Sequence, residues 1–520
     1  MNFKLTIIPL LMFFMLSCEQ VTHHSDYDRL GLEEITVDQL HQGFLNGEFT
    51  VQEVTAAYLA RIDDIDKNGP VLNSILTVNP HAMEIAAGLD RELQEGSVRG
   101  VLHGIPVILK DNIDTADMQT TAGSRFMEGS IPPRDAYITE LLREKGAIIL
   151  GKANLSEWAN FHSSFSSSGW SSLGGQVKNP YELSRNPCGS SSGSGSAISA
   201  NLATLAIGTE TNGSIVCPSG ANGVVGFKPT IGLWSRSGII PISYTTDSAG
   251  PMVRTVRDAA ILLGELAGID ERDSKTNEAV GHIQDDYTQF LNENGIQGKR
   301  IGFYTSPMGN FFRVDTLMLQ TVRLFEEMGA EIVEIDQITE TNIGGDAFQV
   351  LLYEFKDGLN NYLDSLGDEA PVRSIEHLAE LTNEFNDRDR FDRNLIISAS
   401  EMDGLDSENY RKALDNMLTE SRVNGIDRVM DEHQLDAIIS PTGSPAWKTD
   451  LTLGDNFKLS SSSPSARSGY PIISLPMGTI DGLPVGLSIF GRAWSEPVLL
   501  EIAYAFEQRR GARPLPLFLE

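Results

Sequence analysis

The chain has 520 residues, of which 41% are hydrophobic and 21% are charged, and its formal net charge is −31. This length can bury a large core, either as one big α/β domain or as two or three smaller domains. The negative charge argues against a nucleic-acid partner, because a surface that binds phosphates needs clustered lysine and arginine. The acidic excess therefore predicts a well-solvated surface and says nothing about the fold.

The N-terminus predicts a targeting segment that ends at residue 18. Lys4 makes its start positive, and Leu5 to Leu16 form an apolar run too short to cross a bilayer. The run ends at Ser17-Cys18, which is similar to a bacterial lipobox with Cys18 as the lipid-attachment residue, although Met15 stands where leucine is usual. A buried N-terminal helix is the alternative. The lipobox reading makes residues 19–30 a polar tether and places an exported protein at the cell envelope, tethered peripherally to a membrane facing the periplasm or at the cell surface. No later segment is a convincing membrane span.

The first half of the chain alternates helical and strand patterns. Apolar residues at helical spacing over 35–66 predict two helices joined by a glycine-containing turn, and "VLHGIPVILKDNI" (101–113) predicts a strand with a polar tip. Residues 137–158 predict a helix, a strand that begins at Ala147, and a loop. The small and apolar residues of 197–206 predict a buried helix. This alternation is typical of an α/β sheet.

The second half returns to strands after an acidic interval. Residues from about 270 to 430 are acidic and predict helices, whereas "LDAIISPT" and "YPIISLPMGTIDGLPVGLSIFGR" predict strands, followed by a helix from Glu496. We therefore expect a single large α/β domain over 31–520, with a mixed, twisted β-sheet covered by helices on both faces. Its catalytic core would comprise about 95–260 and 435–515, on either side of a variable helical region.

The stretch "PCGSSSGSGSA" (187–197) has the composition of a flexible linker. A linker should separate segments that can stand alone, yet an almost wholly apolar run follows here, with a second glycine-rich turn within twenty residues. A phosphate-binding loop is a further alternative, but the spacing matches neither GxxxxGK[ST] nor a GxGxxG that opens a helix after a strand. Its serines offer hydroxyls that can donate, accept or attack.

A catalytic serine requires a base, and two arrangements are open. A Ser-His-Asp triad could use His103, His162 or His433, but none lies near a GxSxG-like turn, and structural histidines are the prediction we favour. Lys110 is the other candidate base. From the residues alone, it could equally be an exposed lysine at a strand end paired with Asp111.

Several long motifs resemble the amidase signature family of serine hydrolases. That family typically reads PGGSSGGSA, then GTDxGGSIRxPA, then GLKPTxGRVSRxG; this chain has "PCGSSSGSGSA", "GTETNGSIVCPSG" and "GFKPTIGLWSRSG" in the same order. "HGIPVILKDNI", "GKANLSEW" and the terminal block "LPVGLSIFGRAWSEPVLLEIAYAFEQ" also match. The resemblance covers most of residues 30–515 and is weakest in the acidic region.

The resemblance implies a Ser-Ser-Lys triad for hydrolysis of a carboxamide through an acyl-enzyme. Ser214 would be the nucleophile, Ser190 the bridging serine beside a cis peptide bond at Gly189-Ser190, and Lys110 the base. The backbone N–H groups of Thr211, Asn212, Gly213 and Ser214 would form the oxyanion hole. To accept a proton, Lys110 needs a pKa lowered from about 10.4 to about 7, which disfavours its ammonium form by ~4.6 kcal/mol. No metal or cofactor is implied.

Departures from the family pattern favour its bacterial peptide amidase branch, whose members remove the C-terminal amide of peptides. Cys188, Ser192 and Asn212 stand where glycine is usual, and the arginine of "SIRxP" is missing. Cys188 and Cys217 flank the two serines, so the thiols are expected to be neighbours; we predict free, packed thiols, with a disulfide as the alternative.

Two further landmarks and two rival functions remain. Asp247 is expected to accept hydrogen bonds from backbone donors, and Arg236 to brace a loop. A small amide or a peptide amide is the expected partner of the site. The rivals are a broad-specificity or small-molecule amidase and, from another class, a catalytically silent substrate-binding lipoprotein of the same fold. The helical region would line the acyl pocket, and the oligomeric state stays open.

Overall fold

The computed structural model describes residues 25–520 except 369, 383 and 385. The targeting segment, Cys18 and most of the tether that we predicted lie outside the described residues. Residues 26–29, which we expected to belong to the tether, form the first helix instead. Tyr27 is buried there, and its ring packs edge-on against Tyr58, which joins this helix to the folded domain.

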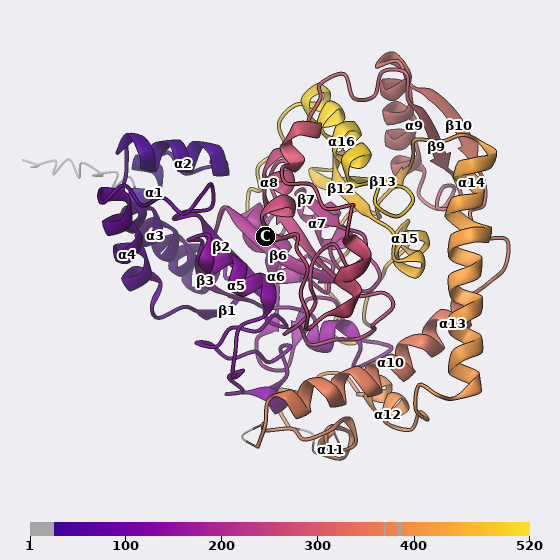
Figure 1. Ribbon diagram of the computed structural model, residues 1–520, viewed down its shortest axis with the longest axis horizontal. Coiled ribbons are helices and arrows are strands. Elements are labelled where there is room, and N and C mark those ends of the chain that lie inside the picture. The colour runs from indigo at the N-terminus through magenta and orange to yellow at the C-terminus, as the bar shows by residue number, and fades with distance from the viewer. Residues whose placement is uncertain (1–24, 369, 383, 385) are drawn as a thin grey trace, which may run out of the picture.

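The described chain folds around one large mixed sheet (Figure 1). Its eleven strands lie in the order β1-β3-β2-β6-β8-β7-β12-β13-β11-β9-β10, and both parallel and antiparallel neighbours occur. The strands of the structure, including the small β4-β5 pair, are β1 (Ile75–Val78), β2 (Pro106–Lys110), β3 (Ile148–Ala153), β4 (Trp170–Ser171), β5 (Gly175–Gln176), β6 (Leu205–Glu210), β7 (Val225–Lys228), β8 (Ser248–Val253), β9 (Arg300–Tyr304), β10 (Glu331–Ile335), β11 (Ala437–Pro441), β12 (Ile472–Ile480) and β13 (Leu483–Phe490).

Helices flank this sheet, which confirms the predicted fold class (Figure 1). No described helix is long and apolar enough to span a membrane. The α-helices are α1 (Asp26–Arg29), α2 (Val37–Asn46), α3 (Val51–Arg61), α4 (Ala82–Gln94), α5 (Tyr137–Glu144), α6 (Ser192–Ser199), α7 (Val216–Asn222), α8 (Val256–Leu266), α9 (Phe312–Glu327), α10 (Gly344–Ser365), α11 (Ile375–Leu381), α12 (Asn394–Ser400), α13 (Glu408–Ser421), α14 (Asp427–Glu432), α15 (Ser463–Ser468) and α16 (Glu496–Arg510).

Several predicted elements are confirmed with shifted boundaries. The helical pair is α2 and α3, and Gly47 ends α2 in the left-handed conformation that glycine adopts readily. The buried helix predicted over 197–206 is wrong in its bounds: α6 begins within the Ser/Gly stretch, and β6 already starts at Leu205. A positive φ of 57° at Asn201 separates the two elements.

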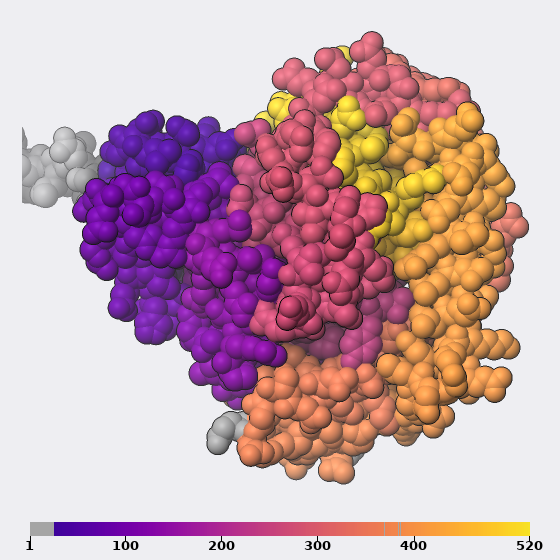
Figure 2. All heavy atoms as spheres, in the orientation of Figure 1, coloured from indigo at the N-terminus to yellow at the C-terminus, as the bar shows by residue number. Residues whose placement is uncertain are grey.

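The acidic region is less purely helical than its composition indicates. It contributes β9 and β10, which are parallel neighbours at one edge of the sheet, and its helices α10 to α14 pass along the lower and right-hand side of the view in Figure 1. In the space-filling view, this orange segment borders the rest of the molecule on the same sides (Figure 2). The two halves of the predicted core therefore share one sheet, and the helical region flanks it.

Candidate active site

Lys110 lies at the carboxyl end of β2 and is fully buried. Its Nζ is 2.7 Å from Ser190 Oγ and 2.8 Å from Thr209 Oγ1, and it also lies 3.2 Å from the carbonyl oxygen of Thr209. β6 runs parallel to β2, so Thr209 lies near the carboxyl end of its strand, on the same side of the sheet as Lys110 at the carboxyl end of β2. Burial lowers the pKa of Lys110 to about 7, although the carboxylates of Asp247 and Glu210 act in the opposite direction. An amine with that pKa can accept a proton at neutral pH.

The alternative of an exposed Lys110 paired with Asp111 is wrong. Both residues are buried, and Asp111 instead lies 3.5 Å from the Nζ of Lys152, a second buried lysine on β3. Asp111 also accepts hydrogen bonds from Thr121, so it organises the turn after β2. The two adjacent side chains at the end of this strand therefore have separate partners.

The Ser/Gly stretch is a packed part of the core and not a linker. Its predicted cis peptide bond at Gly189-Ser190 is confirmed. A Cβ atom on Gly189 would lie 2.3 Å from Ser156 Oγ, and one on Gly193 would lie 2.3 Å from the carbonyl oxygens of Asn154 and Ser74. Such approaches exclude any side chain, which explains why the sequence here contains so many small residues.

Ser214 lies in the turn between β6 and α7, with 9% of its surface exposed. Its carbonyl oxygen accepts a 3.1 Å hydrogen bond from the backbone N–H of Ser191, which places the segments of the two predicted catalytic serines side by side. Within the part of the chain that the structure describes, none of the N–H groups of the predicted oxyanion hole, Thr211 to Ser214, donates a hydrogen bond. Four successive N–H groups are thus available to a ligand.

This turn is held from its two ends. Glu210 Oε2 accepts hydrogen bonds from the N–H groups of Ile215 (2.7 Å) and Val216 (3.0 Å), just after Ser214. Asp247 Oδ1 accepts the hydroxyl of Thr211 at 2.6 Å. The side chain of Asn212, one of the departures from the family pattern, accepts a 2.7 Å hydrogen bond from Ser462. Because these acceptors fix the turn, its free N–H groups are preorganised.

Cys188 and Cys217 form a disulfide, so the prediction of free thiols is wrong. The expectation that the two cysteines are neighbours, because they flank the two serines, is confirmed. In the fold, the Ser191–Ser214 backbone bond and the packing of α6 against α7 bring the two Cα atoms to 6.0 Å, within the span of a disulfide. The bridge joins the segment of Ser190 to that of Ser214, and both cysteines line the cleft that Ser214 also lines.

Reducing this bridge is expected to destabilise the enzyme and lower its activity. The chain-entropy model gives roughly 3–4 kcal/mol for a closed loop of about 30 residues. We expect the melting temperature of the chain without its first 18 residues to fall by several degrees in dithiothreitol. The Cys188→Ala/Cys217→Ala double variant should melt at one temperature with or without the reductant. Two titratable thiols in the unfolded, unreduced protein would contradict the bridge.

Ser214 opens onto a cleft of about 350 Å³. Aromatic and apolar side chains form much of its wall, with Trp447 and Phe457 packed edge to face at 5.6 Å. Leu351 of α10 also lines the cleft, which agrees with the expectation that the helical region contributes to the acyl pocket. The half-buried carboxylate of Asp455 accepts hydrogen bonds from Trp447 Nε1 and Ser168 and so fixes this wall.

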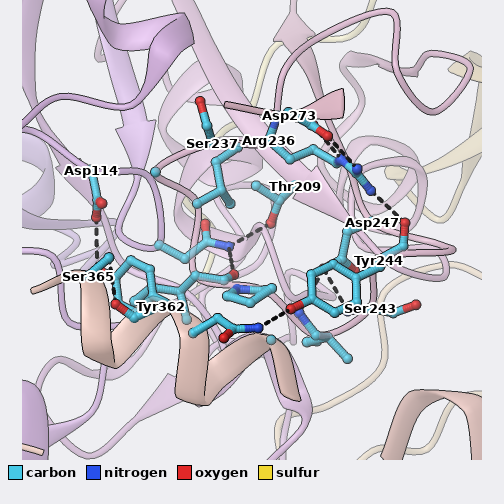
Figure 3. A pocket seen from close by; sticks show the side chains of 18 of the residues that line it. Asp114, Thr209, Arg236, Ser237, Ser243, Tyr244, Asp247, Asp273, Tyr362 and Ser365 are labelled. Carbon is cyan, nitrogen blue, oxygen red and sulfur yellow. Dashed lines mark hydrogen bonds and ion pairs between the residues drawn. The ribbon is translucent and has the colours of Figure 1, made fainter. Parts of the chain in front are cut away.

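The scaffold roles predicted for two charged residues are confirmed. Asp247 Oδ2 accepts the backbone N–H groups of Ile242 (2.7 Å) and Ser243 (2.8 Å). Arg236 pairs with Asp273 and donates to the carbonyl oxygen of Tyr244, so it braces a loop. Figure 3 shows these groups around a second cavity of about 280 Å³, which shares Thr211 with the cleft.

Two of the histidines considered as candidate bases, His103 and His162, have structural roles. His103 is buried, and its ring nitrogens meet the N–H of Arg99 and the carbonyl oxygen of Leu89. His162 is buried against the carbonyl oxygen of Glu157. No described histidine lines the cleft with Ser214. Among the described residues, no group of three or more histidine, cysteine, aspartate or glutamate side chains is arranged to hold a metal ion.

Sequence reasoning missed several residues of the site. Thr209 accepts hydrogen bonds from Lys110 at both its carbonyl oxygen and its hydroxyl. The side-chain amide of Asn112 also donates to the hydroxyl of Thr209, at 3.0 Å. Thr209 lies five residues before Ser214 at the end of a strand, a spacing that could have indicated it. Trp447 and Asp455 lie in a long irregular segment between β11 and α15, where no periodicity shows that they face Ser214.

The chain belongs to the amidase family, whose model matches residues 53–500. It is therefore a hydrolase that acts on amide C–N bonds. A probable amidase of Arabidopsis thaliana is 39% identical over 94% of this chain and 92% of its own length. The A subunit of a glutamyl-tRNA(Gln) amidotransferase of Caldanaerobacter subterraneus is 34% identical over 92% of this chain and 96% of its own. Among solved structures, the native peptide amidase of Stenotrophomonas maltophilia is 45% identical, with a TM-score of 0.89, over 94% of this chain and 99% of that one.

Proposed function

We propose that this chain is a serine amidase that uses Ser214, Ser190 and Lys110 to remove the amide from the C-terminus of peptides. The observation that carries the proposal is the buried amine of Lys110, with a pKa of about 7, hydrogen-bonded to a serine whose segment lies beside Ser214. An unassisted serine hydroxyl is a poor nucleophile and an amide a poor electrophile, so the reaction needs both a base and an oxyanion hole.

The first half-reaction acylates Ser214. Ser214 Oγ bonds to the amide carbonyl carbon while its proton passes to Ser190 Oγ, and the proton of Ser190 passes to the neutral Nζ of Lys110. The carbonyl π electrons move to oxygen, which the N–H groups of residues 211–214 stabilise. The C–N bond then breaks as Lys110 returns the proton through Ser190 to the nitrogen, and ammonia leaves.

The second half-reaction releases the acid. Water attacks the acyl carbonyl carbon and gives its proton through Ser190 to Lys110. The ester bond to Ser214 Oγ breaks, and Ser214 recovers its proton by the same route. The products are the peptide acid and ammonia, and each group of the chain returns to its starting protonation state. Lys110 is the residue that must alternate between amine and ammonium.

Two observations favour a peptide amide over a small amide. The cleft at Ser214 shares Trp447 and Asp455 with a neighbouring hollow that extends past Leu453 and Lys458, so there is room for a chain of several residues. The relative that is a peptide amidase is also more similar (45% identical) than the amidotransferase subunit (34%). A broad-specificity or small-molecule amidase is the second candidate.

The test is ammonia release by the chain without its first 18 residues. We would compare an N-acetylated tripeptide amide, the same peptide with a free carboxyl group, propionamide and glutamine. A kcat/KM for the peptide amide at least 100-fold above that for propionamide supports a peptide amidase. Equal values, or a preference for glutamine, support the broad-specificity or small-molecule amidase and contradict the peptide amidase. The free acid reports ammonia from any contaminating activity.

We also propose that the full chain is exported and held at the cell envelope by a lipid on Cys18. The support is the charged start, the short apolar run and the position of this cysteine at its end. In a bacterial host fed radiolabelled palmitate, the full chain should carry label and sediment with membranes. Cys18→Ala should lose the label, and Cys188→Ala should keep it. Label on Cys18→Ala would refute the anchor.

A further inference from the structure

Glu354 of α10 is a buried carboxylate that reaches out of the helical region to the loop before β8. Its Oε2 accepts the hydroxyl of Ser243 and the N–H of Thr245, the latter at 3.0 Å. Its Oε1 accepts the hydroxyl of Thr245 at 2.6 Å and that of Tyr410, on α13, at 2.7 Å. Three of these four hydrogen bonds come from the loop, so Glu354 ties the loop to α10.

The loop that Glu354 holds is the one that carries Asp247. The backbone N–H of Ser243 donates to Asp247 Oδ2 at 2.8 Å, and the hydroxyl of Thr211 donates to Asp247 Oδ1 at 2.6 Å. The sheet register explains this geometry. Glu210 pairs with Ser248 at the end of the β6–β8 ladder, and Thr211 and Asp247 are the residues immediately beyond these two strand ends. A short chain of hydrogen bonds thus leads from α10 to the turn of residues 211–214, which carries the proposed oxyanion hole and is called the oxyanion turn below.

Packing and hydrogen bonds both hold this loop against α10, because Ile240 and Ile242 belong to the same buried apolar cluster as Phe355 of α10. A cavity of about 280 Å³ lies between them, lined by Ser243, Tyr244 and Asp247 of the loop and by Tyr362 and Ser365 of α10 (Figure 3). Beside this cavity, Ser243 and Thr245 are held by their hydrogen bonds to Glu354. The position of Asp247 therefore depends on this acceptor as well as on packing.

We propose that Glu354 is a positioning residue for the oxyanion hole: through Ser243, Thr245 and Asp247 it holds Thr211 where its N–H group meets the developing oxyanion. This inference rests on the proposed function, because it requires the N–H groups of 211–214 to act on the reacting carbonyl. A donor that moves by about 1 Å loses much of its effect, and loss of one oxyanion donor costs roughly 10²–10³ in kcat.

The experiment measures kcat, KM and inhibition by a peptidyl trifluoromethyl ketone in the purified enzyme. Ser214 Oγ bonds to the ketone carbon, its proton passes to Lys110, and the oxygen anion that results occupies the oxyanion hole. For Glu354→Leu we expect kcat to fall roughly 30–100-fold, KM to change less than threefold, and the inhibition constant to rise in proportion to the loss of kcat/KM. Glu354→Gln keeps one acceptor oxygen and should recover most of both losses.

Two further variants distinguish a specific role of Glu354 from a general disturbance of the loop. Ser243→Ala removes one contact of Glu354 and should lower kcat and ketone affinity together, about 5–10-fold. Tyr244→Phe removes hydrogen bonds between the same loop and α10, to Asp357 and Asn361, without touching Glu354, and should change neither.

The outcomes distinguish a failure of the role proposed for Glu354 from a failure of the proposed function. Parallel losses of kcat and ketone affinity in Glu354→Leu and Ser243→Ala support the inference. Loss of kcat with unchanged ketone affinity would show a purely structural role and overturn it, as would equal effects in Tyr244→Phe. If the ketone binds the unaltered enzyme and Ser214→Ala equally well, the proposed function itself is wrong.

Discussion

Ser214→Ala is expected to lower kcat for a peptide amide by at least about 10⁴-fold while KM changes little. Without the hydroxyl, no bond to the carbonyl carbon can form, whereas the cleft wall of Trp447 and Phe457 and the oxyanion turn are unaffected. Alanine removes one oxygen atom from a residue that is already nearly buried, so the melting temperature should stay within a degree or two of the starting value. Residual activity is measured as ammonia release over hours.

Ser219→Ala is the matched control for this variant. Ser219 lies five residues further on, is buried in α7 and donates to the carbonyl oxygen of Ile215, so its loss tests the helix without changing Ser214. We expect full labelling by a fluorophosphonate probe in Ser219→Ala and none in Ser214→Ala. Turnover by Ser214→Ala above about one hundredth of the starting kcat would mean that another residue attacks the amide.

Lys110→Met is expected to lower kcat roughly 10³–10⁴-fold, because Ser190 would lose the group that takes its proton. In the unaltered enzyme, kcat/KM should rise with pH and level off above a pKa of about 7, since only the neutral amine accepts a proton and the amine fraction grows as the pH passes this value. Below this pH, each unit should cost about tenfold in rate. The measurement is a pH profile of kcat/KM between pH 5 and 9.

Lys110→Arg tests whether Lys110 acts as a base or only as a positive charge. A guanidinium can donate to Ser190 and Thr209 but does not lose its proton in this range, so this variant should be as inactive as Lys110→Met. If Lys110→Arg keeps more than about a tenth of the activity, the lysine acts as a cation and Ser190 needs another base. A flat pH profile in the unaltered enzyme would lead to the same conclusion.

Much of the fold and the core of the site could be predicted from the sequence. Lys110, Ser190 and the turn at Ser214 lie in long motifs whose order and spacing carry the resemblance, and the structure brings all of them to one edge of the sheet. β2 and the C-terminal strands were predictable because apolar runs bounded by glycine and proline have few other interpretations.

The remaining features depend on contacts between distant segments. α7 is short and contains glycine and proline, which local propensity assigns to a loop, yet Glu210 caps its first N–H groups. β9 and β10 lie among acidic helices and gain their stability by pairing at the edge of the sheet. The motifs predicted that the two cysteines are neighbours, but whether they form a disulfide depends on the Cα separation of 6.0 Å that the fold sets. Glu354 meets its loop across more than 100 residues, in the region where the family resemblance is weakest.

One turn of α10 contributes both to the cleft and to the loop of Asp247. Leu351 lines the cleft at Ser214, and Glu354, three residues further on, holds the loop of Asp247. Residues at this spacing are neighbours on a helix, so we expect substitutions at Leu351 to affect Glu354 as well as the cleft. With the role proposed for Glu354, selection for a new substrate, natural or in the laboratory, is then expected to change turnover together with preference. Libraries that vary α10 should be screened for both quantities at once.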